Sequence, residues 1–217
     1  MAHIEEYKGK RIVICNNARR CIHSRHCVLT TPDVFVPNVS GPWIHPDKAA
    51  AEVAISTVAK CPSGALTYEP ADSSVAAEMP PGVNTVRVWE DGPLAFLAEL
   101  DIDGDKPSVR ATLCRCGKSN HKPFCDRMHL KAGFKATGEP PSKEIATLAV
   151  RHGPLKVTPT KNGPLHAVGA LEVCTASGRT ISRDVEMWLC RCGHSNDKPF
   201  CDGSHEKVGF IAPGVEE

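Results

Sequence analysis

The feature that most constrains how this chain can fold is an internal repeat. Residues 113–134, LCRCGKSNHKPFCDRMHLKAGF, recur as residues 189–210, LCRCGHSNDKPFCDGSHEKVGF. The two copies differ at six of 22 aligned positions, so 16 positions are identical. Self-similarity of this kind indicates that one structural unit has been duplicated. Because neither copy alone could bury much apolar surface, we expect the two copies to pack together as one domain.

The sequence around the repeats predicts a mostly-β domain over residues 83–217, with modules of about 83–135 and 145–212. A Gly-Pro-Leu turn precedes each copy and opens an apolar stretch, and neighbouring segments alternate apolar and polar residues with a period of two. The expected strands are residues 83–90, 92–100, 109–113, 163–173 and 183–189.

Residues 1–69 have a different pattern and predict a separate, small domain. They contain a short apolar strand at 12–15, a cysteine-rich loop and a helix over 47–62 that Pro62 ends. Residues 70–82 are rich in Pro, Ser and Ala and predict a linker. The whole chain is therefore expected to be of the α+β class. The expected buried stripe of the helix consists of Val53, Ala54, Ile55 and Val58.

Composition and charge narrow the possible functions. Lys and Arg total 26 against 25 Asp and Glu, a net charge of +1, which predicts neither a nucleic-acid partner nor binding to a membrane surface. No apolar run reaches the roughly 18 residues of a membrane span, and the N-terminal segment does not resemble a signal peptide. We therefore expect a cytoplasmic protein. Eleven cysteines in such a compartment favour metal binding over disulfides.

Each repeat contains the pattern Cys-x-Cys-x8-Cys-x3-His, which supplies four metal donors. A set of buried thiols with surface histidines is the simpler alternative, but identical spacing in both copies argues against it. Zinc is the other alternative, although structural zinc sites usually have two to four residues between the first two cysteines. The Cys-x-Cys pair suits one iron and the Cys-x3-His arm a second iron. The candidate ligands are Cys114, Cys116, Cys125, His129, Cys190, Cys192, Cys201 and His205.

The second repeat, CRCGHSNDKPFCDGSH, resembles the CDGSH iron-sulfur domain of mitoNEET-type proteins over about residues 83–212. In that family three Cys and one His hold a [2Fe-2S] cluster, and two modules pair around a β-sandwich. The resemblance therefore implies two [2Fe-2S] clusters on the eight candidate ligands. It also implies a pseudo-two-fold pair of modules within one chain, and hence a monomer.

The first repeat departs from that pattern, because Arg127 and Met128 stand where the second has Gly203 and Ser204. Since glycine permits a positive φ and a serine hydroxyl can donate a hydrogen bond, the substitutions are expected to affect the first site. The charge of Arg127, if close to a cluster, should raise its reduction potential.

The N-terminal cysteines predict a third metal site. Cys21 and Cys27 lie in CIHSRHC, and Cys61 precedes a proline, as the remote cysteine of bacterial ferredoxins does. Ser24 occupies the position of a middle ligand. Over about residues 5–70 the chain resembles a divergent, ferredoxin-like single-cluster 4Fe-4S domain, which implies a [3Fe-4S] or [4Fe-4S] cluster. The candidates for a further donor are Cys15, His23 and His26.

These patterns lead to three hypotheses of function. The first is an iron-sulfur protein that serves in electron transfer or redox sensing with a redox partner protein, and is not an enzyme. The second is a carrier that delivers clusters to an apo-protein acceptor. The third is a zinc-stabilised interaction module. No catalytic set of residues is apparent, and neutral imidazole ligands predict clusters that acid destabilises.

Overall fold

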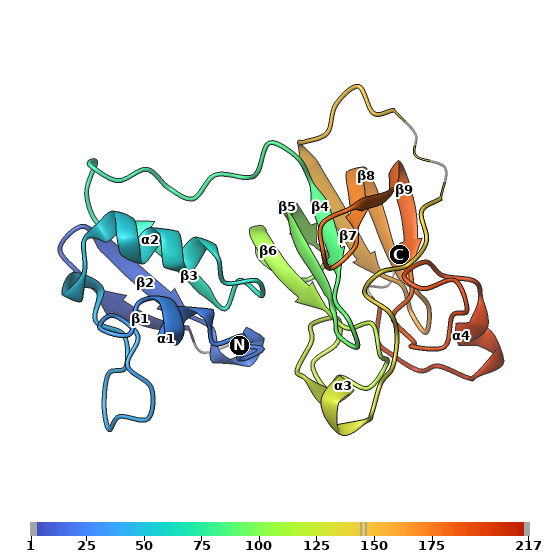
Figure 1. The fold of residues 1–217 in the computed structure, drawn as a ribbon, viewed down its shortest axis with the longest axis horizontal. Coiled ribbons are helices and arrows are strands. Elements are labelled where there is room, and N and C mark those ends of the chain that lie inside the picture. Colours follow the sequence, from blue (N-terminus) through green and yellow to red (C-terminus); the bar gives the residue numbers. More distant parts are fainter. Residues whose placement is uncertain (1–3, 144, 146, 215–217) are drawn as a thin grey trace. The chain divides into compact units, whose positions relative to one another are not determined.

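The computed structural model describes residues 4–143, 145 and 147–214, and the chain separates into two compact units (Figure 1). The first unit spans Met1–Met79 and the second spans Pro80–Glu217. Each unit has a hydrophobic core of its own. The two units are therefore described separately.

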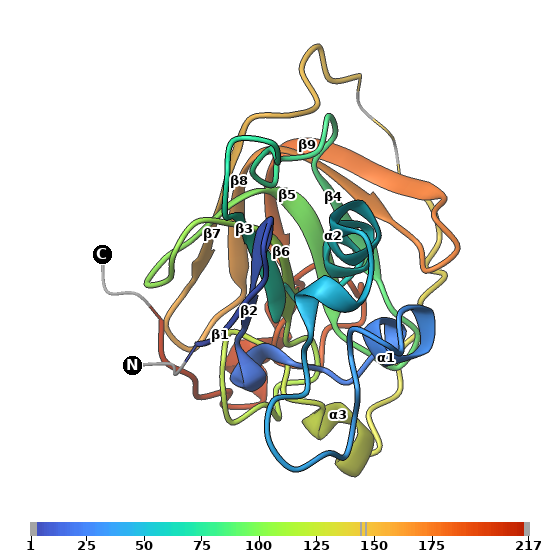
Figure 2. The same ribbon diagram turned by 90° about the vertical axis from the view of Figure 1, so that its left-hand side faces the viewer.

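The first unit is a three-stranded antiparallel sheet with short helices packed on it (Figure 2). The central strand has alternating and β-branched apolar residues, which suits a strand buried on one face. The helix α2 contacts β3, and a cluster of apolar residues fills the space between helices and sheet. The elements are β1 (Glu5–Lys8), β2 (Ile12–Asn16), η1 (Ala18–Arg20), α1 (His26–Thr30), η2 (Pro46–Lys48), α2 (Ala51–Ala59) and β3 (Leu66–Pro70).

The helix predicted over residues 47–62 is shorter than expected. A 3-10 turn ends at Lys48, Ala49 is extended, and α2 begins only at Ala51. Within α2, Ala54 and Val58 are buried as predicted, but Val53 is 49% exposed, so its predicted burial is wrong. Thr57 takes the buried position instead. Its hydroxyl contacts the Thr31 hydroxyl at 2.6 Å, which satisfies the polar group inside the core.

The second unit contains a six-stranded sheet, and its strands fall into two equivalent sets of three. The five strands predicted here are confirmed, with boundaries that differ by a few residues, whereas β7 was not predicted. One four-residue helix follows the third strand of each set. The elements are β4 (Thr85–Val88), β5 (Leu94–Ile102), β6 (Ser108–Leu113), α3 (Met128–Lys131), β7 (Pro154–Pro159), β8 (Leu165–Cys174), β9 (Thr180–Leu189) and α4 (Ser204–Lys207).

Strands pair both within each module and between the two modules. Within each module the first strand pairs antiparallel with the second, and the second with the third. Across the modules, β4 pairs parallel with β8, and β7 pairs parallel with β5. Each of the long strands β5 and β8 therefore contacts both modules. The two modules consequently share one sheet and one core.

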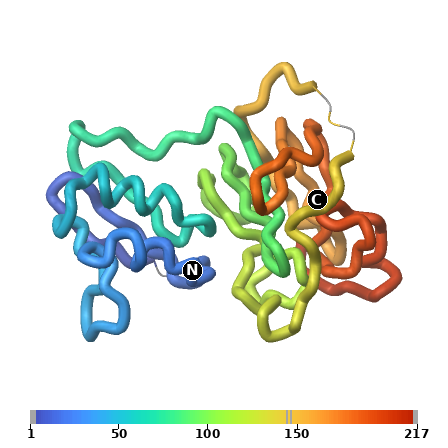
Figure 3. The backbone as a smooth tube through the Cα atoms, in the orientation of Figure 1, coloured from blue at the N-terminus to red at the C-terminus, as the bar shows by residue number. Residues whose placement is uncertain are grey.

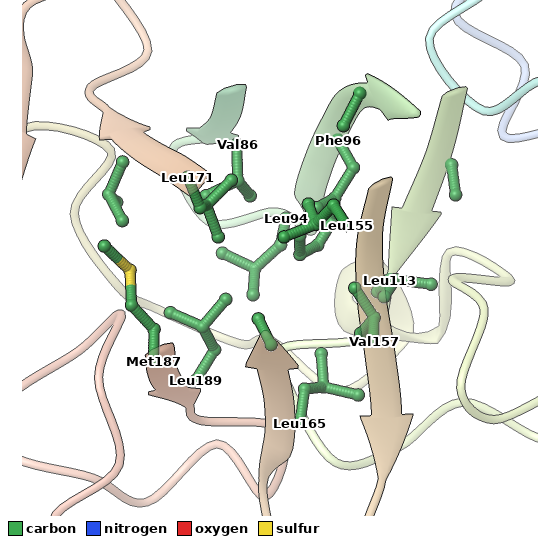
Figure 4. Close-up of a cluster of buried hydrophobic side chains, with 14 of the residues drawn as sticks. Val86, Leu94, Phe96, Leu113, Leu155, Val157, Leu165, Leu171, Met187 and Leu189 are labelled. Carbon is green, nitrogen blue, oxygen red and sulfur yellow. The ribbon is translucent and has the colours of Figure 1, made fainter. Parts of the chain in front are cut away.

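The shared core lies between these strands and is drawn in part in Figure 4. Leu94 and Leu113 come from the first module, and Leu165 and Leu189 are their counterparts in the second. Phe124 and Phe200, which follow the strands in sequence, also pack against this core. Their position anchors the cysteine-rich loops to the sheet.

Among the described residues, no helix has the length and apolar character required to cross a membrane.

Candidate metal centres

The cysteine-rich loops after β6 and β9 leave the same end of the second unit (Figures 1 and 3). Each loop folds back on the strand before it, because the amide of the first cysteine donates to a proline carbonyl further along. This bond joins Cys114 to Pro123 and Cys190 to Pro199, at 2.8 Å in both copies. The amide of the third cysteine likewise donates a hydrogen bond to a carbonyl near the end of the preceding strand. The Cys125 amide, for example, donates to the Thr112 carbonyl at 2.9 Å.

These backbone hydrogen bonds place the predicted donors in close pairs. The sulfurs of Cys114 and Cys116 are 3.7 Å apart, and those of Cys190 and Cys192 are 3.6 Å apart. Two thiolates on one tetrahedral metal, with bonds of about 2.3 Å, would lie about 3.8 Å apart. The Cys-x-Cys pairs therefore have the spacing of two sulfur ligands that share one metal.

The third cysteine and the histidine form a second pair in each loop. The Cys125 sulfur lies 3.5 Å from His129 Nδ1, and the Cys201 sulfur lies 3.4 Å from His205 Nδ1. For a sulfur at about 2.3 Å and a nitrogen at about 2.0 Å on one tetrahedral metal, the expected separation is about 3.5 Å. In both copies the nitrogen that faces the thiol is Nδ1.

The donors form two pairs rather than one set of four. Nowhere in the described part of the chain do three or more His, Cys, Asp or Glu side chains gather closely enough to hold a single metal ion. A structural zinc ion needs four donors around one point. A group with two metal atoms, each held by one pair, fits this arrangement better.

Backbone amides surround the sulfurs and favour thiolates. The amide of Lys118 donates to Cys116 Sγ, that of Arg127 to Cys125 Sγ and that of His194 to Cys192 Sγ, each at 3.4 Å. Hydrogen bonds to a thiolate stabilise its charge and favour metal ligation.

The first cysteine of each pair is the more acidic of the two. A hydrogen bond from the Cys116 thiol, followed by those from nearby backbone amides, lowers the pKa of Cys114. The Cys192 thiol lowers the pKa of Cys190 in the same way.

Gly203 and its counterpart in the first module, Arg127, have the same backbone conformation. Gly203 has φ of 81° and Arg127 has φ of 71°, and both precede a short helix that carries the histidine. Asp126 and Asp202 each accept a hydrogen bond from the second amide along, that of Met128 at 3.0 Å and Ser204 at 2.9 Å. The substitution of glycine by arginine therefore leaves the loop geometry intact.

The two loops touch each other through their backbones. A Cβ atom added to Gly117 would overlap the carbonyl of Cys192, and one added to Gly193 would overlap that of Cys116. Both glycines also have positive φ, 76° and 88°. Only glycine allows this approach, so the two candidate sites lie side by side.

Sequence analysis did not single out Arg115 and Arg191, which stand between the paired cysteines. Both are 1% exposed, an unusual state for a charged side chain. Their occurrence at the same position in both repeats was the available signal. The charges of Cys190 and Cys116 act on Arg115, and that of Cys114 acts on Arg191, so these cations bear on the charge of any group held there.

In the first unit the predicted thiols Cys21, Cys27 and Cys61 act on one another. Burial raises the pKa of Cys27, and the charges of Cys61 and Cys21 add to that increase. Cys27 and Cys61 also pack against the core of this unit. The charges of these thiols act on one another, and their assignment as ligands of a shared group stays a prediction.

The candidate fourth donors lie in different surroundings. Cys15 lies within β2 and is 8% exposed, and burial raises the pKa of its thiol. His23 and Ser24 are exposed, and His26 begins α1 and contacts the Thr30 hydroxyl. The choice among these donors stays a prediction.

The donor pairs and the cysteine-rich first unit together indicate a class of protein, one that binds metal through cysteine and histidine side chains. Comparison with known families makes the class specific. Residues 7–70 match the family described as divergent 4Fe-4S mono-cluster. Residues 87–130 and 162–206 each match the family described as iron-binding zinc finger CDGSH type. A search of the curated proteins finds no match.

The chain therefore consists of a divergent 4Fe-4S mono-cluster domain followed by two CDGSH-type domains, and it is an iron-sulfur protein. Both resemblances inferred from the sequence are confirmed.

Proposed function

We propose that this protein carries three iron-sulfur clusters and serves in electron transfer or redox sensing, without turnover of a substrate. The observation that carries the proposal is the pairing of donors, Cys with Cys and Cys with His, at the spacing of one shared metal and in two copies. When bound, a [2Fe-2S] cluster supplies a reversible one-electron couple. The chain supplies the ligands, the burial and the hydrogen bonds.

The proposed ligands of the two [2Fe-2S] clusters divide by module. Cys114, Cys116, Cys125 and His129 would hold the first cluster. The corresponding residues of the second module, Cys190, Cys192, Cys201 and His205, would hold the second. The matching strand pairings of the modules support a pseudo-two-fold arrangement around a β-sandwich.

For the first unit we propose a [3Fe-4S] or [4Fe-4S] cluster on Cys21, Cys27 and Cys61. The electrostatic interaction among these thiols and the family match of residues 7–70 support it. Three thiolates leave one iron corner of a [4Fe-4S] cluster for another donor, or suit a [3Fe-4S] cluster.

The contact between the two cysteine loops favours electron transfer. Because Gly117 packs against Cys192 and Gly193 packs against Cys116, two redox groups held by these loops would be neighbours. An electron entering one site could pass to the other without a large rearrangement. A redox partner protein in the same compartment is the proposed source or acceptor, and we propose a cytoplasmic, monomeric protein.

One observation favours the second candidate, a cluster carrier. Cys190 and Cys192 are 1% and 4% exposed, whereas Cys201 and His205 are only half-buried. The outer pair is thus accessible to an incoming acceptor thiol. The zinc-stabilised interaction module is the least favoured hypothesis, because the donors are paired instead of gathered around one point.

One experiment separates these functions. The anaerobically purified protein is reduced with dithionite, reoxidised, and then incubated with an apo-ferredoxin that accepts [2Fe-2S]. An electron carrier is expected to cycle reversibly and to keep its iron, whereas a cluster carrier would transfer iron and sulfide to the acceptor. A protein that neither cycles nor transfers would contradict both proposals.

A further inference from the structure

Arg191 is a buried cation whose hydrogen-bond partners, as far as the described residues go, are neutral carbonyl groups of its own module. Its Nε donates to the Gly163 carbonyl at 2.8 Å, and its Nη2 donates to the carbonyls of Pro213, at 3.0 Å, and Thr160. The guanidinium also lies over the Phe210 ring, 5.6 Å from its centroid. These contacts fix the plane of the guanidinium but do not neutralise its charge.

The remaining nitrogen of this guanidinium, Nη1, is buried and has no hydrogen-bond partner within the described part of the chain. An unpaired buried donor costs about 1–3 kcal/mol, and more when it is charged. Buried polar groups in folded proteins nearly always have a partner. An unpaired charged donor beside a candidate metal site therefore points to an acceptor that the site provides when it is filled.

The loop that carries Arg191 packs against the Cys-x-Cys pair of the other module. Burial lowers the pKa of Arg191 to about 10, and the charge of Cys114 acts in the opposite direction. The backbone geometry agrees, because Gly193, two residues after Arg191, packs against the carbonyl of Cys116. The segment of the second module that carries Arg191 thus lies against the first module's Cys-x-Cys pair.

Arg115, the counterpart in the first module, differs in its hydrogen bonds. Its Nη1 donates to the Thr137 carbonyl at 3.2 Å, its Nη2 to the carbonyls of Trp89 and Ala136, and its Nε to that of Gly92. The charges that act on it include Cys190, but also the carboxylates of Glu90 and Asp91. Every nitrogen of this guanidinium has a carbonyl partner. Of the two arginines, only Arg191 therefore has a buried nitrogen without a hydrogen-bond partner in the described part of the chain.

We propose that Arg191 is a positioning residue for the metal group of the opposite module, and that its free Nη1 donates a hydrogen bond to sulfur at the Cys114 site. This inference rests on the proposed function, since it requires a cluster there. A buried positive charge and a hydrogen bond to sulfur both favour the reduced, more negative state of an iron-sulfur cluster. Arg191 therefore makes the first cluster easier to reduce, although it lies in the sequence of the second.

The test is a redox titration of the full chain, followed by electron paramagnetic resonance, with Arg191→Gln and the matched control Arg115→Gln. His205→Cys and His129→Cys variants assign the signals, because an added thiolate lowers the potential of its own cluster. Iron and sulfide are measured first for each protein. A wild-type protein without sulfide would defeat the proposed function and would be recognised before any arginine variant is interpreted.

We expect Arg191→Gln to lower the ratio of reduced to oxidised first cluster about tenfold at a fixed potential, equivalent to about 59 mV for a one-electron couple. The second cluster should change much less. Arg115→Gln should not reproduce this selective loss at the first cluster. A loss confined to the second cluster, an equal loss at both or no loss would overturn the proposal.

If Arg191→Gln does not fold, Arg191→Lys serves in its place. It retains a charge but lacks the planar group that supplies Nη1. A smaller decrease, again selective for the first cluster, is expected. An unchanged first cluster in this variant would contradict the inferred hydrogen bond.

Discussion

At the scale of single residues, Arg127 shows how one module can depart from the sequence pattern and keep its geometry. A non-glycine residue in the left-handed region carries a cost of about 1–2 kcal/mol. The surrounding hydrogen bonds, among them that from the Met128 amide to Asp126, hold the loop in place despite that cost. The departure is therefore a local strain and leaves the site in place.

The strain predicts that Arg127→Gly stabilises the protein. The φ of 71° becomes favourable for glycine, so we expect the free energy of unfolding to rise by about 1 kcal/mol, measured by urea denaturation. The matched control is Gly203→Ala, at φ of 81° with open space around the new Cβ. That variant should lose about 1 kcal/mol. A destabilised Arg127→Gly protein would show that the arginine makes stabilising contacts that outweigh its strain.

The same arginine predicts a difference in acid sensitivity. Burial and the charges of Arg127 and Arg115 lower the pKa of His129, against the opposite effects of Asp126 and Asp91. Only the neutral imidazole binds metal, so a lower pKa lets the ligand persist to lower pH. Acid should therefore remove the first cluster at a lower pH in the wild type than in Arg127→Gly.

This shift is measured by following the visible absorbance of the clusters as the pH falls. His129→Cys, which has no imidazole to protonate at this site, serves as the control. The second cluster provides an internal reference in each sample. Equal pH midpoints for the first cluster in wild type and Arg127→Gly would refute the role given to the arginine charge.

At the scale of structural elements, the decisive contact is that between the two cysteine loops. Gly117 in one module and Gly193 in the other each face a carbonyl of the opposite loop, with no room for a side chain. The two loops are thereby held against each other. This geometry predicts that damage to one loop extends to both sites.

Gly117→Ala tests this coupling. Overlap with the Cys192 backbone and the positive φ together should cost about 3 kcal/mol or more, and iron content should fall in both modules. Gly133→Ala is the matched control, because Gly133 has φ of 60° with no atoms near the new Cβ. It should lose about 1 kcal/mol and keep its iron. Loss of iron from the first module alone would mean that the loops fold independently.

The elements also show what the sequence could and could not predict. The repeat and its donor spacing were readable because each loop is built from one continuous segment. The parallel pairing of β4 with β8 and of β7 with β5 could not be predicted, because it joins strands far apart in sequence and leaves no local pattern. The short edge strand β1 has no apolar alternation that would have revealed it.

Burial was the other quantity that local patterns failed to predict. Thr57 is buried because Thr31 provides a partner from another segment. Arg191 is buried because three carbonyls from distant positions surround it. Such partners are known only once the chain has folded. The candidate donors were thus predictable from sequence, whereas the arginine that would tune them was not.

At the scale of the whole molecule, the chain joins two kinds of iron-sulfur domain. The first unit matches a single-cluster family, and the second unit contains two matches to another. A shared sheet unites the two CDGSH-type modules, so a change in one is expected to reach the other. The second unit is therefore one compact body with two neighbouring candidate metal sites.

We propose that each repeat holds a pair of irons rather than one zinc ion. The most direct test is quantification of iron, acid-labile sulfide and zinc in protein prepared without oxygen from iron-replete cells. We predict roughly seven irons per chain with a [3Fe-4S] cluster in the first unit, or roughly eight with a [4Fe-4S] cluster, and matching sulfide. Stoichiometric zinc without sulfide, in a colourless preparation, would contradict it.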